Sequence, residues 1–410
     1  MASLPAHPDR DQIARVPEPA PEPPALPEPL GPGVYVHVPF CHVRCPYCDF
    51  AVRPYRAEEA PVLVRAVAAE AQRRAPPGAV PWGSLYFGGG TPSRLTPEDF
   101  RALVQGIDQA LEFAPGHERS LEANPEDLDD ARLAAWRAAG FTRLSIGVQS
   151  FDDEELARLG RVHDARAAAE GVARARAQGF TNLSVDLMYA FPGNDDAHFA
   201  ASLARAIDLA PEHVSAYAYT AESGTPMGDA VKAGRVQRAD EDGEAALFEL
   251  ARDTLEGAGF RHYEISNFAR AGYETRHHLQ YWRRGDYLGL GPSAASFLDG
   301  RRVRAPRGLT TWARSIDEGV APADWVVDDA RPHAMFETVF LGLRLDVGMR
   351  LADARDANLD ERALWRAAAS PLVDAGFLVP TKDGFRVPRA ERARTDAIAL
   401  LWRAAAERSA

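Results

Sequence analysis

Short apolar runs alternate with alanine-rich helical patterns from residue 33 to about residue 265, and this alternation restricts the fold more than any other feature. The runs are shorter than helices and carry Val, Leu, Ile and Tyr, which is typical of buried strands. Strands that alternate with helices form parallel sheets, because each helix carries the chain back to the start of the next strand. The predicted strands cover residues 34–38, 84–87, 120–123, 144–149, 183–188 and 214–219.

Residues that start or stop helices support this layout. Residues 97–112 place apolar side chains on one helical face, and Thr96 precedes them as a natural N-cap. Pro97 suits the first helical position, and Asp99 stands where the acid of a capping box is expected. Glycine followed by an apolar residue ends helices through a left-handed turn and lets a strand follow, and three Gly-Phe pairs come after helical patterns. The pairs begin at Gly140, Gly179 and Gly259.

Six strand–helix units predict an α/β fold, a partial (β/α)6 barrel of the TIM type with ligand-binding loops at the carboxyl ends of its strands. The pattern changes near residue 300, where helical stretches flank a hairpin with an Asp-Gly turn at 377–388. This combination resembles a winged-helix module. The chain therefore divides into a disordered proline-rich tail (1–32), a barrel (33–265), a connecting segment (266–300) and a C-terminal helical, winged-helix-like domain (301–410).

Composition excludes several classes of function. The net charge of −12 argues against binding to nucleic acid, which needs a positive surface, and favours a docking or lid role for the C-terminal module. The sequence contains no apolar run of 18 residues, so we expect no membrane-spanning segment. Its first ten residues lack the apolar region of a signal peptide, so we expect a cytoplasmic protein. Peripheral membrane contact and a homodimer contact are compatible with the sequence.

The three cysteines of the chain, Cys41, Cys45 and Cys48, follow the first predicted strand with the spacing C-x3-C-x2-C. An odd number of cysteines without an export signal argues against disulfides. Thiolates prefer soft metals, so an iron–sulfur cluster and zinc are the candidates. A structural zinc ion needs a fourth ligand, and His42 is too close to Cys41 in sequence to serve easily. Three ligands suit a [4Fe–4S] cluster with one open iron, which is the interpretation that we favour.

This cysteine spacing after the first strand resembles that of radical S-adenosylmethionine (SAM) proteins, in which the open iron binds the amino and carboxylate groups of SAM. The segment Tyr86-Phe-Gly-Gly-Gly-Thr-Pro92 resembles the glycine loop of that family. Consecutive glycines let backbone groups approach a ligand closely. Polar side chains also stand at the carboxyl ends of the next strands, and these ends converge on one barrel mouth.

From residue 33 to about 400 the chain resembles the oxygen-independent coproporphyrinogen dehydrogenase group of that family. The resemblance implies a [4Fe–4S] cluster and SAM as cofactors. It implies SAM contacts at Tyr35, Tyr47, Gly89, Gly90, Thr91, Glu122, Gln149, Arg161 and Asp186.

Two branches of this group compete. The dehydrogenases carry a further cysteine two residues after the third ligand, where this chain has Phe50, and the segments 263–267, 277–282 and 337–344 resemble the HemW heme-chaperone branch. That branch implies heme as a ligand and a heme-acceptor protein as a partner. The chain departs from it in having Ala295 where a histidine is expected and a histidine in place of asparagine in the motif HHLQYW. The residues of this motif predicted to contact heme are His277, His278 and Tyr281. The alternative is a coproporphyrinogen III dehydrogenase.

Overall fold

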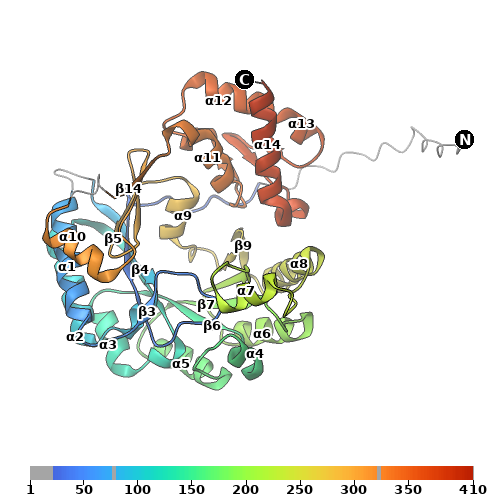
Figure 1. Cartoon of the computed structure of the whole chain (residues 1–410). Helices are drawn as coiled ribbons and strands as arrows, with labels where there is room; N and C mark the ends of the chain where they lie inside the picture. The colour runs from blue at the N-terminus through green and yellow to red at the C-terminus, as the bar shows by residue number, and fades with distance from the viewer. Residues whose placement is uncertain (1–21, 76–79, 321–324, 410) are drawn as a thin grey trace, which may run out of the picture.

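The computed structural model describes residues 22–75, 80–320 and 325–409, and a 12-stranded sheet forms its centre. Six neighbouring strands of this sheet run parallel and curl into a barrel whose helices lie outside (Figure 1). This arrangement confirms the predicted α/β fold and the partial (β/α)6 barrel. The six strands are β1 (Gly33–Val38), β4 (Trp82–Gly89), β5 (Phe113–Ala123), β6 (Arg143–Gln149), β7 (Asn182–Tyr189) and β8 (His213–Ala218).

The predicted start of α2 and the predicted glycine turns are present, although α2 ends at Ala110, two residues before the predicted end. The backbone N–H of Asp99 donates to Thr96 Oγ1 at 3.1 Å, which is the predicted N-cap of α2. Gly140 has φ +81°, and the N–H of Phe141 donates to the carbonyl of Trp136, so a glycine turn ends α3. The helices that follow the six strands are α1 (Ala60–Arg74), α2 (Pro97–Ala110), α3 (Asp130–Ala138), α5 (Ala165–Ala177), α6 (Asp196–Asp208) and α8 (Glu241–Gly257).

Beyond β1 the sheet continues with the parallel strand β11 and then with antiparallel strands, and antiparallel strands also follow β8. Within the described residues β9 and β14 are the two ends of the sheet, so the barrel is open. None of the helices in this part of the chain is long and apolar enough to cross a membrane. The remaining strands of the sheet are β9 (Arg261–Glu264), β10 (Asn267–Ala269), β11 (Tyr287–Leu290), β12 (Ala295–Leu298), β13 (Arg301–Arg304) and β14 (Val326–Asp329). Shorter elements are β2 (Phe40–Cys41), β3 (Arg53–Pro54), α4 (Asp153–Arg158), α7 (Pro226–Lys232), α9 (Arg276–Trp282) and α10 (Leu309–Asp317).

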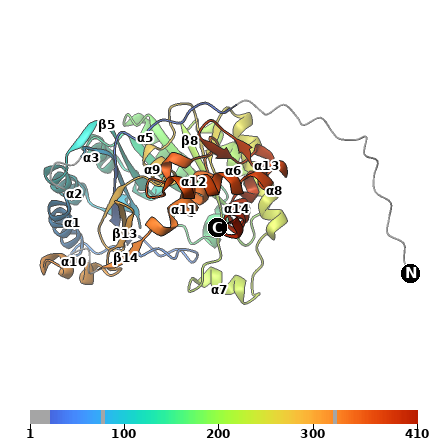
Figure 2. The same cartoon turned by 90° about the horizontal axis from the view of Figure 1, so that it is seen from above.

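The C-terminal domain has its own hydrophobic core and sits against the barrel (Figures 1 and 2). The sequence pattern predicts that this domain starts at residue 301, but Trp312 and Trp325 pack into the barrel core, and the second core begins at Ala334. The predicted hairpin is present as a small three-stranded sheet. The elements are α11 (Ala334–Gly342), α12 (Leu359–Ala368), α13 (Ser370–Asp374), α14 (Thr395–Ser409), β15 (Met349–Arg350), β16 (Val379–Pro380) and β17 (Gly384–Arg386).

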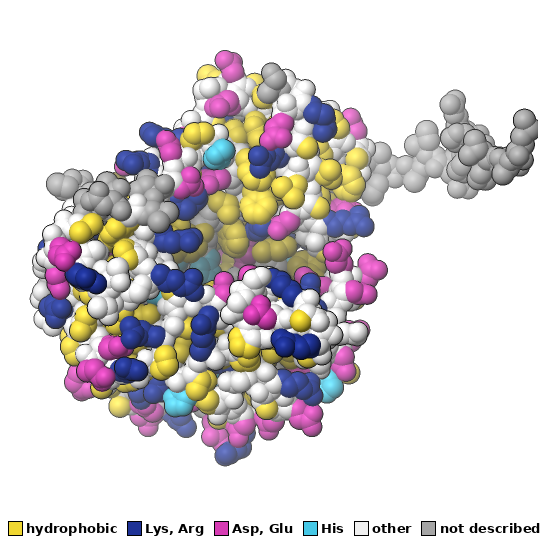
Figure 3. All heavy atoms as spheres, in the orientation of Figure 1, with side chains coloured by type: hydrophobic (Ala, Val, Ile, Leu, Met, Phe, Trp, Pro, Cys, Tyr) yellow, Lys and Arg dark blue, Asp and Glu magenta, His cyan; other side chains and the backbone are white. Residues whose placement is uncertain are grey.

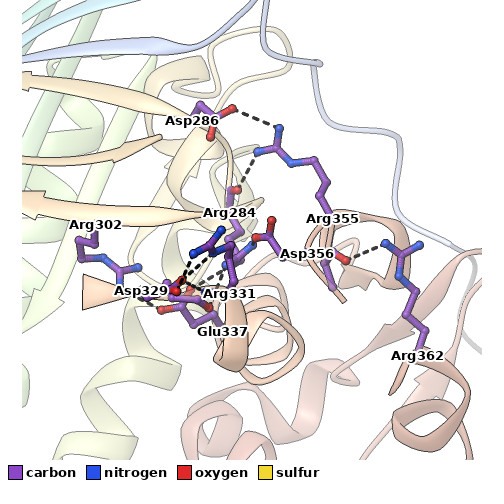
Figure 4. A network of polar contacts seen from close by, with 11 residues as sticks. Arg284, Asp286, Arg302, Asp329, Arg331, Glu337, Arg355, Asp356 and Arg362 are labelled. Carbon is purple, nitrogen blue, oxygen red and sulfur yellow. Dashed lines mark hydrogen bonds and ion pairs between the residues drawn. The ribbon is translucent and has the colours of Figure 1, made fainter. Parts of the chain in front are cut away.

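A network of buried ion pairs joins the connecting segment to the C-terminal domain (Figure 4). Arg284 is 3% exposed, and its guanidinium donates to Glu337 at 2.8 Å and to Asp356 at 2.7 Å. Arg302 on β13 donates to the same Glu337 at 3.0 Å. Because the carboxylates come from the C-terminal domain, and the arginines from the turn after α9 and from β13, these pairs hold the two parts together.

The predicted tail falls partly outside the described residues, which begin at residue 22. Leu26 is 5% exposed and packs in a cluster with Tyr263 and Leu279. Glu28 forms an ion pair with Arg283 at 2.7 Å. Residues 22–32 therefore lie against the barrel and α9 and are not part of a free tail.

Candidate functional site

A cavity of about 440 Å³ lies at the carboxyl ends of the parallel strands, and the three cysteines line it. Its volume is in the range of small-molecule binding sites. The face of the molecule in Figure 3 is hollowed between the barrel and the C-terminal domain. The position at the strand ends is the one predicted from the barrel topology.

The loop that carries the three cysteines (residues 41–48), here called the cysteine loop, follows β1. Two of its thiols lie against polar groups of the barrel. Thr91 Oγ1 donates to the sulfur of Cys41 at 3.5 Å, and Arg161 Nη1 donates to the sulfur of Cys45 at 3.8 Å. Burial raises the pKa of Cys41 to about 11 and also raises the pKa of Cys48. Without a bound cation these thiols keep their protons, so metal binding would release them.

The spacing of the three sulfurs tests which metal group fits. Within the described part of the chain, no three His, Cys, Asp or Glu side chains are close enough to hold a single metal ion. A zinc ion would need its thiolates together, each about 2.3 Å from the metal. Thiolates are the ligands that iron–sulfur clusters take, so the donor set of the loop, three cysteine sulfurs, is compatible with a cluster.

The glycine loop at the end of β4 needs its glycines for steric reasons. Gly89 has φ +104°, and a Cβ atom there would come within 2.3 Å of the His37 ring. A Cβ on Gly90 would meet the carbonyl oxygen of Val38 at 2.7 Å. The bare backbone therefore forms part of the cavity wall, where it can approach a ligand closely.

Two carboxylates face the cavity from β5 and β7. Glu122 accepts hydrogen bonds from the Tyr86 hydroxyl at 2.8 Å and the Gly89 N–H at 3.1 Å. Burial, together with the nearby charge of Asp186, raises the pKa of Glu122 to about 7. Burial also raises the pKa of Asp186, although hydrogen bonds from Ser184 and Ser145 act in the opposite direction and lower it. Two carboxylates withdrawn from water favour a cationic ligand such as an ammonium or sulfonium group.

The structure brings together most of the residues predicted to bind SAM. Tyr35 does not line the cavity, since its ring stacks on Tyr86 and its hydroxyl lies 3.0 Å from His37 Nδ1. Gln149 accepts a hydrogen bond from the Tyr217 hydroxyl at 2.6 Å. The predicted residues that line the cavity are Tyr47, Gly89, Gly90, Thr91, Glu122, Gln149, Arg161 and Asp186.

Several lining residues were missed by the sequence analysis. Asn124 accepts a hydrogen bond from Arg161 Nη2 at 2.6 Å, and it stands two residues after Glu122. Alternate side chains of a strand share one face, so counting two residues on from a predicted site residue at a strand end would have found Asn124. The same rule applies to Ser215 and Tyr217, two residues apart on β8.

The two histidines of the HHLQYW motif have different surroundings. His277 is fully buried, with Nδ1 at 2.8 Å from Ser84 Oγ and Nε2 at 2.7 Å from the Tyr281 hydroxyl. His278 lines the cavity, and its imidazole has no hydrogen bond within the described residues. Burial lowers the pKa of His278 to about 4, so its ring is neutral and can offer a nitrogen lone pair.

Comparisons with known proteins agree with this geometry. The family model of the radical SAM superfamily matches residues 35–206, and that of the HemN C-terminal domain matches residues 330–393. The heme chaperone HemW of Bacillus subtilis is 32% identical over 351 residues, which cover 84% of this chain and 92% of the relative. The chain belongs to the HemW family. The heme chaperone HemW of Mycobacterium tuberculosis is 37% identical over 330 residues, covering 78% of this chain and 83% of the relative.

A solved structure supports the fold of this HemW-family chain over nearly its whole length. The coproporphyrinogen III oxidase HemN of Escherichia coli superimposes with a TM-score of 0.77 and covers 91% of this chain and 90% of its own. The two sequences are 23% identical, so this likeness concerns the fold alone. It confirms the radical SAM barrel followed by a C-terminal helical domain.

Proposed function

We propose that this chain is a heme chaperone that binds a [4Fe–4S] cluster, SAM and heme, and passes heme to an acceptor protein. Relatives that align over most of their length are named heme chaperones. The observation that carries the proposal is the shared cavity, which is lined by the three cysteines and by His278, whose ring nitrogens have no hydrogen bond within the described residues. The predicted cytoplasmic location is part of this proposal.

In this proposal the cysteines would hold the cluster, whose open iron supplies a binding site for the amino and carboxylate groups of SAM. Glu122 and the glycine loop would hold the ammonium group, because the carboxylate and backbone of this wall face the cavity. Arg161 is fixed by Asn124 and by the carbonyl of Gly147 at 2.8 Å, so its charge stays beside Cys45. Phe50 and Val43 are exposed on the loop and would shield the cluster when a partner covers it.

His278 is the proposed heme ligand. Both ring nitrogens of His277 are engaged, one by Ser84 and the other by Tyr281, so that residue would have to give up a buried hydrogen bond to bind iron. The ring of His278 is neutral and packs against the rings of Tyr86 and Tyr281, and histidine is a common axial ligand of heme. At position 295 this chain has alanine where the family usually has histidine, and His278 would supply the imidazole that is missing there.

The proposal is tested by anaerobic reconstitution and titration with heme, followed by Soret absorption. We expect His278→Ala to weaken heme affinity by at least about tenfold and to shift the Soret band, because an axial ligand is lost. His198→Ala is the matched control, since that histidine lies on the exposed surface of α6. Unchanged heme binding by His278→Ala would refute the ligand assignment.

The same preparation tests the alternative of a coproporphyrinogen III dehydrogenase. The dehydrogenase pattern has a cysteine where this chain has Phe50, whose side chain is 59% exposed. We expect no conversion of coproporphyrinogen III to protoporphyrinogen IX in the presence of SAM and a reductant. Robust conversion would replace the chaperone proposal with the dehydrogenase.

A further inference from the structure

A continuous row of buried hydrogen bonds runs behind the cavity wall, from β7 to the start of α9. Ser184 Oγ donates to Asp186 Oδ1 at 2.8 Å, and the same oxygen lies 2.8 Å from His213 Nδ1. His213 Nε2 lies 2.9 Å from the Tyr263 hydroxyl, which accepts the backbone N–H of Thr275 at 3.3 Å. The residues between the ends, Ser184, His213 and Tyr263, are at most 1% exposed, and we call these three the relay.

The two ends of the relay impose one direction on its protons. The carboxylate of Asp186 can only accept, so Ser184 donates to it and must accept from Nδ1–H of His213. Burial lowers the pKa of His213 well below its ordinary value, so the ring is neutral and its Nε2 is an acceptor. Tyr263 therefore donates to Nε2 while it accepts from the backbone N–H of Thr275. A single histidine tautomer satisfies every group in the row.

Each end of the relay holds a different wall of the cavity. Asp186 faces the part of the cavity that the proposed function assigns to SAM. Thr275 is the N-cap of α9, the helix that carries His278. The backbone N–H groups of Arg276 and His277 donate to Glu118 on β5, so α9 is fixed to the barrel at its first turn. The relay is a direct polar connection between the SAM wall and the heme helix.

We propose that Ser184, His213 and Tyr263 are positioning residues that hold Asp186 and α9 in register, so that SAM and heme strengthen each other's binding. The inference rests on the proposed function for the identity of the two ligands. A ligand that orders one end of a rigid hydrogen-bonded row also orders the other end, so a second ligand that binds there loses less conformational entropy. Linkage requires the coupling to be reciprocal, so SAM changes heme affinity by the same factor as heme changes SAM affinity.

The test measures four dissociation constants on the full-length reconstituted protein: SAM with and without heme, and heme with and without SAM. Tyr263→Phe removes one hydroxyl and keeps the buried ring. We expect it to weaken SAM binding by about tenfold, because His213 loses its partner and the tautomer is no longer fixed. The ratio of heme affinities with and without SAM should fall to about one.

Tyr219→Phe is the matched control. Tyr219 is also buried, at 3% exposure, and its hydroxyl has no hydrogen-bond partner within the described residues. This variant should keep the SAM affinity and the coupling of the unmodified protein. Ser184→Ala removes only a hydroxyl and interrupts the relay at its other end. If Tyr263→Phe does not fold, the same four dissociation constants measured on Ser184→Ala test whether the relay couples the two sites.

The outcomes separate this inference from the proposed function. Tyr263→Phe or Ser184→Ala with unchanged SAM affinity and unchanged coupling would overturn the relay. Weaker SAM binding with the coupling intact would overturn the connection to α9. Failure of the unmodified protein to bind heme would refute the proposed function and the coupling together, while the SAM affinities would still decide whether the relay positions Asp186.

Discussion

The barrel and the C-terminal domain use their charged residues in opposite ways. In the barrel, Glu122 and Asp186 face an internal cavity, and an apolar core surrounds them. In the C-terminal domain, the core around Ile398 and Trp402 is apolar, and Glu337 and Asp356 instead face the sheet. A carboxylate kept from water in a cavity costs stability unless a ligand compensates it, whereas a paired one at a contact fixes an orientation.

The carboxylates of the cavity therefore serve ligand binding, and those of the contact serve attachment of the C-terminal domain. Changes inside the barrel cavity should alter ligand affinity and leave the C-terminal domain in place. Changes at the contact of Figure 4 should release the domain and leave the cysteine loop intact, since the cysteines contact Thr91 and Arg161 of the barrel. Three experiments can break or sharpen this comparison.

The largest effect is expected from Cys45→Ala. With one of three thiolate ligands removed, we expect almost complete loss of the cluster, seen in iron and sulfide analysis and in the EPR spectrum of the reduced protein. Val43→Ala, in the same exposed loop, should keep the cluster. A normal cluster in Cys45→Ala would show that these cysteines are not its ligands, and altered unfolding of the C-terminal domain would break the separation of the two regions.

Arg284→Met should detach the C-terminal domain. It leaves Glu337 and Asp356 without their shared buried cation, and breaking a buried pair costs about 3–5 kcal/mol. We expect scanning calorimetry to resolve an earlier, separate unfolding transition, with SAM affinity retained. Arg331→Ala, which removes the exposed pair with Asp329 in the same network, should give no measurable change.

A single transition at the original temperature in Arg284→Met would mean that apolar contacts attach the domain. The candidate contact is the packing of Leu26 and Leu279 with Leu345, which also lies at this junction. In that case the ion pairs would fix the orientation of the C-terminal domain without adding to its free energy of unfolding.

The smallest effect is a pH dependence of SAM binding. Burial raises the pKa of Glu122 to about 7, because it disfavours the charged form. A cationic ligand favours the ionised form, so binding releases a proton and affinity rises as pH increases through this pKa. We expect SAM affinity to rise about tenfold between about pH 6 and about pH 8, measured by calorimetry with the cluster intact.

Glu122→Gln should bind SAM more weakly and lose the pH dependence. Thermal unfolding of the C-terminal domain should not follow this change, because its core lies outside the cavity. An unaltered pH profile in Glu122→Gln would show that another group, such as Asp186, titrates in this range.

The sequence alone determined the features that depend on neighbours along the chain. The six parallel strands, the cap at Thr96 and the glycine turn at Gly140 follow from hydrophobic period and local backbone preference, and all three are present. The cysteine spacing placed three thiols in one loop, and barrel topology placed that loop at the carboxyl ends of the strands.

Only the tertiary structure decided which of two adjacent histidines faces the cavity. His277 and His278 are equivalent in sequence, but successive residues of a helix point about 100° apart, so α9 turns the first toward Ser84 and the second toward the cavity. The contacts of the relay and of Arg284 join residues up to 50 positions apart (His213 to Tyr263) and 72 apart (Arg284 to Asp356). No local preference encodes such contacts, because they form only when packing brings distant strands and helices together.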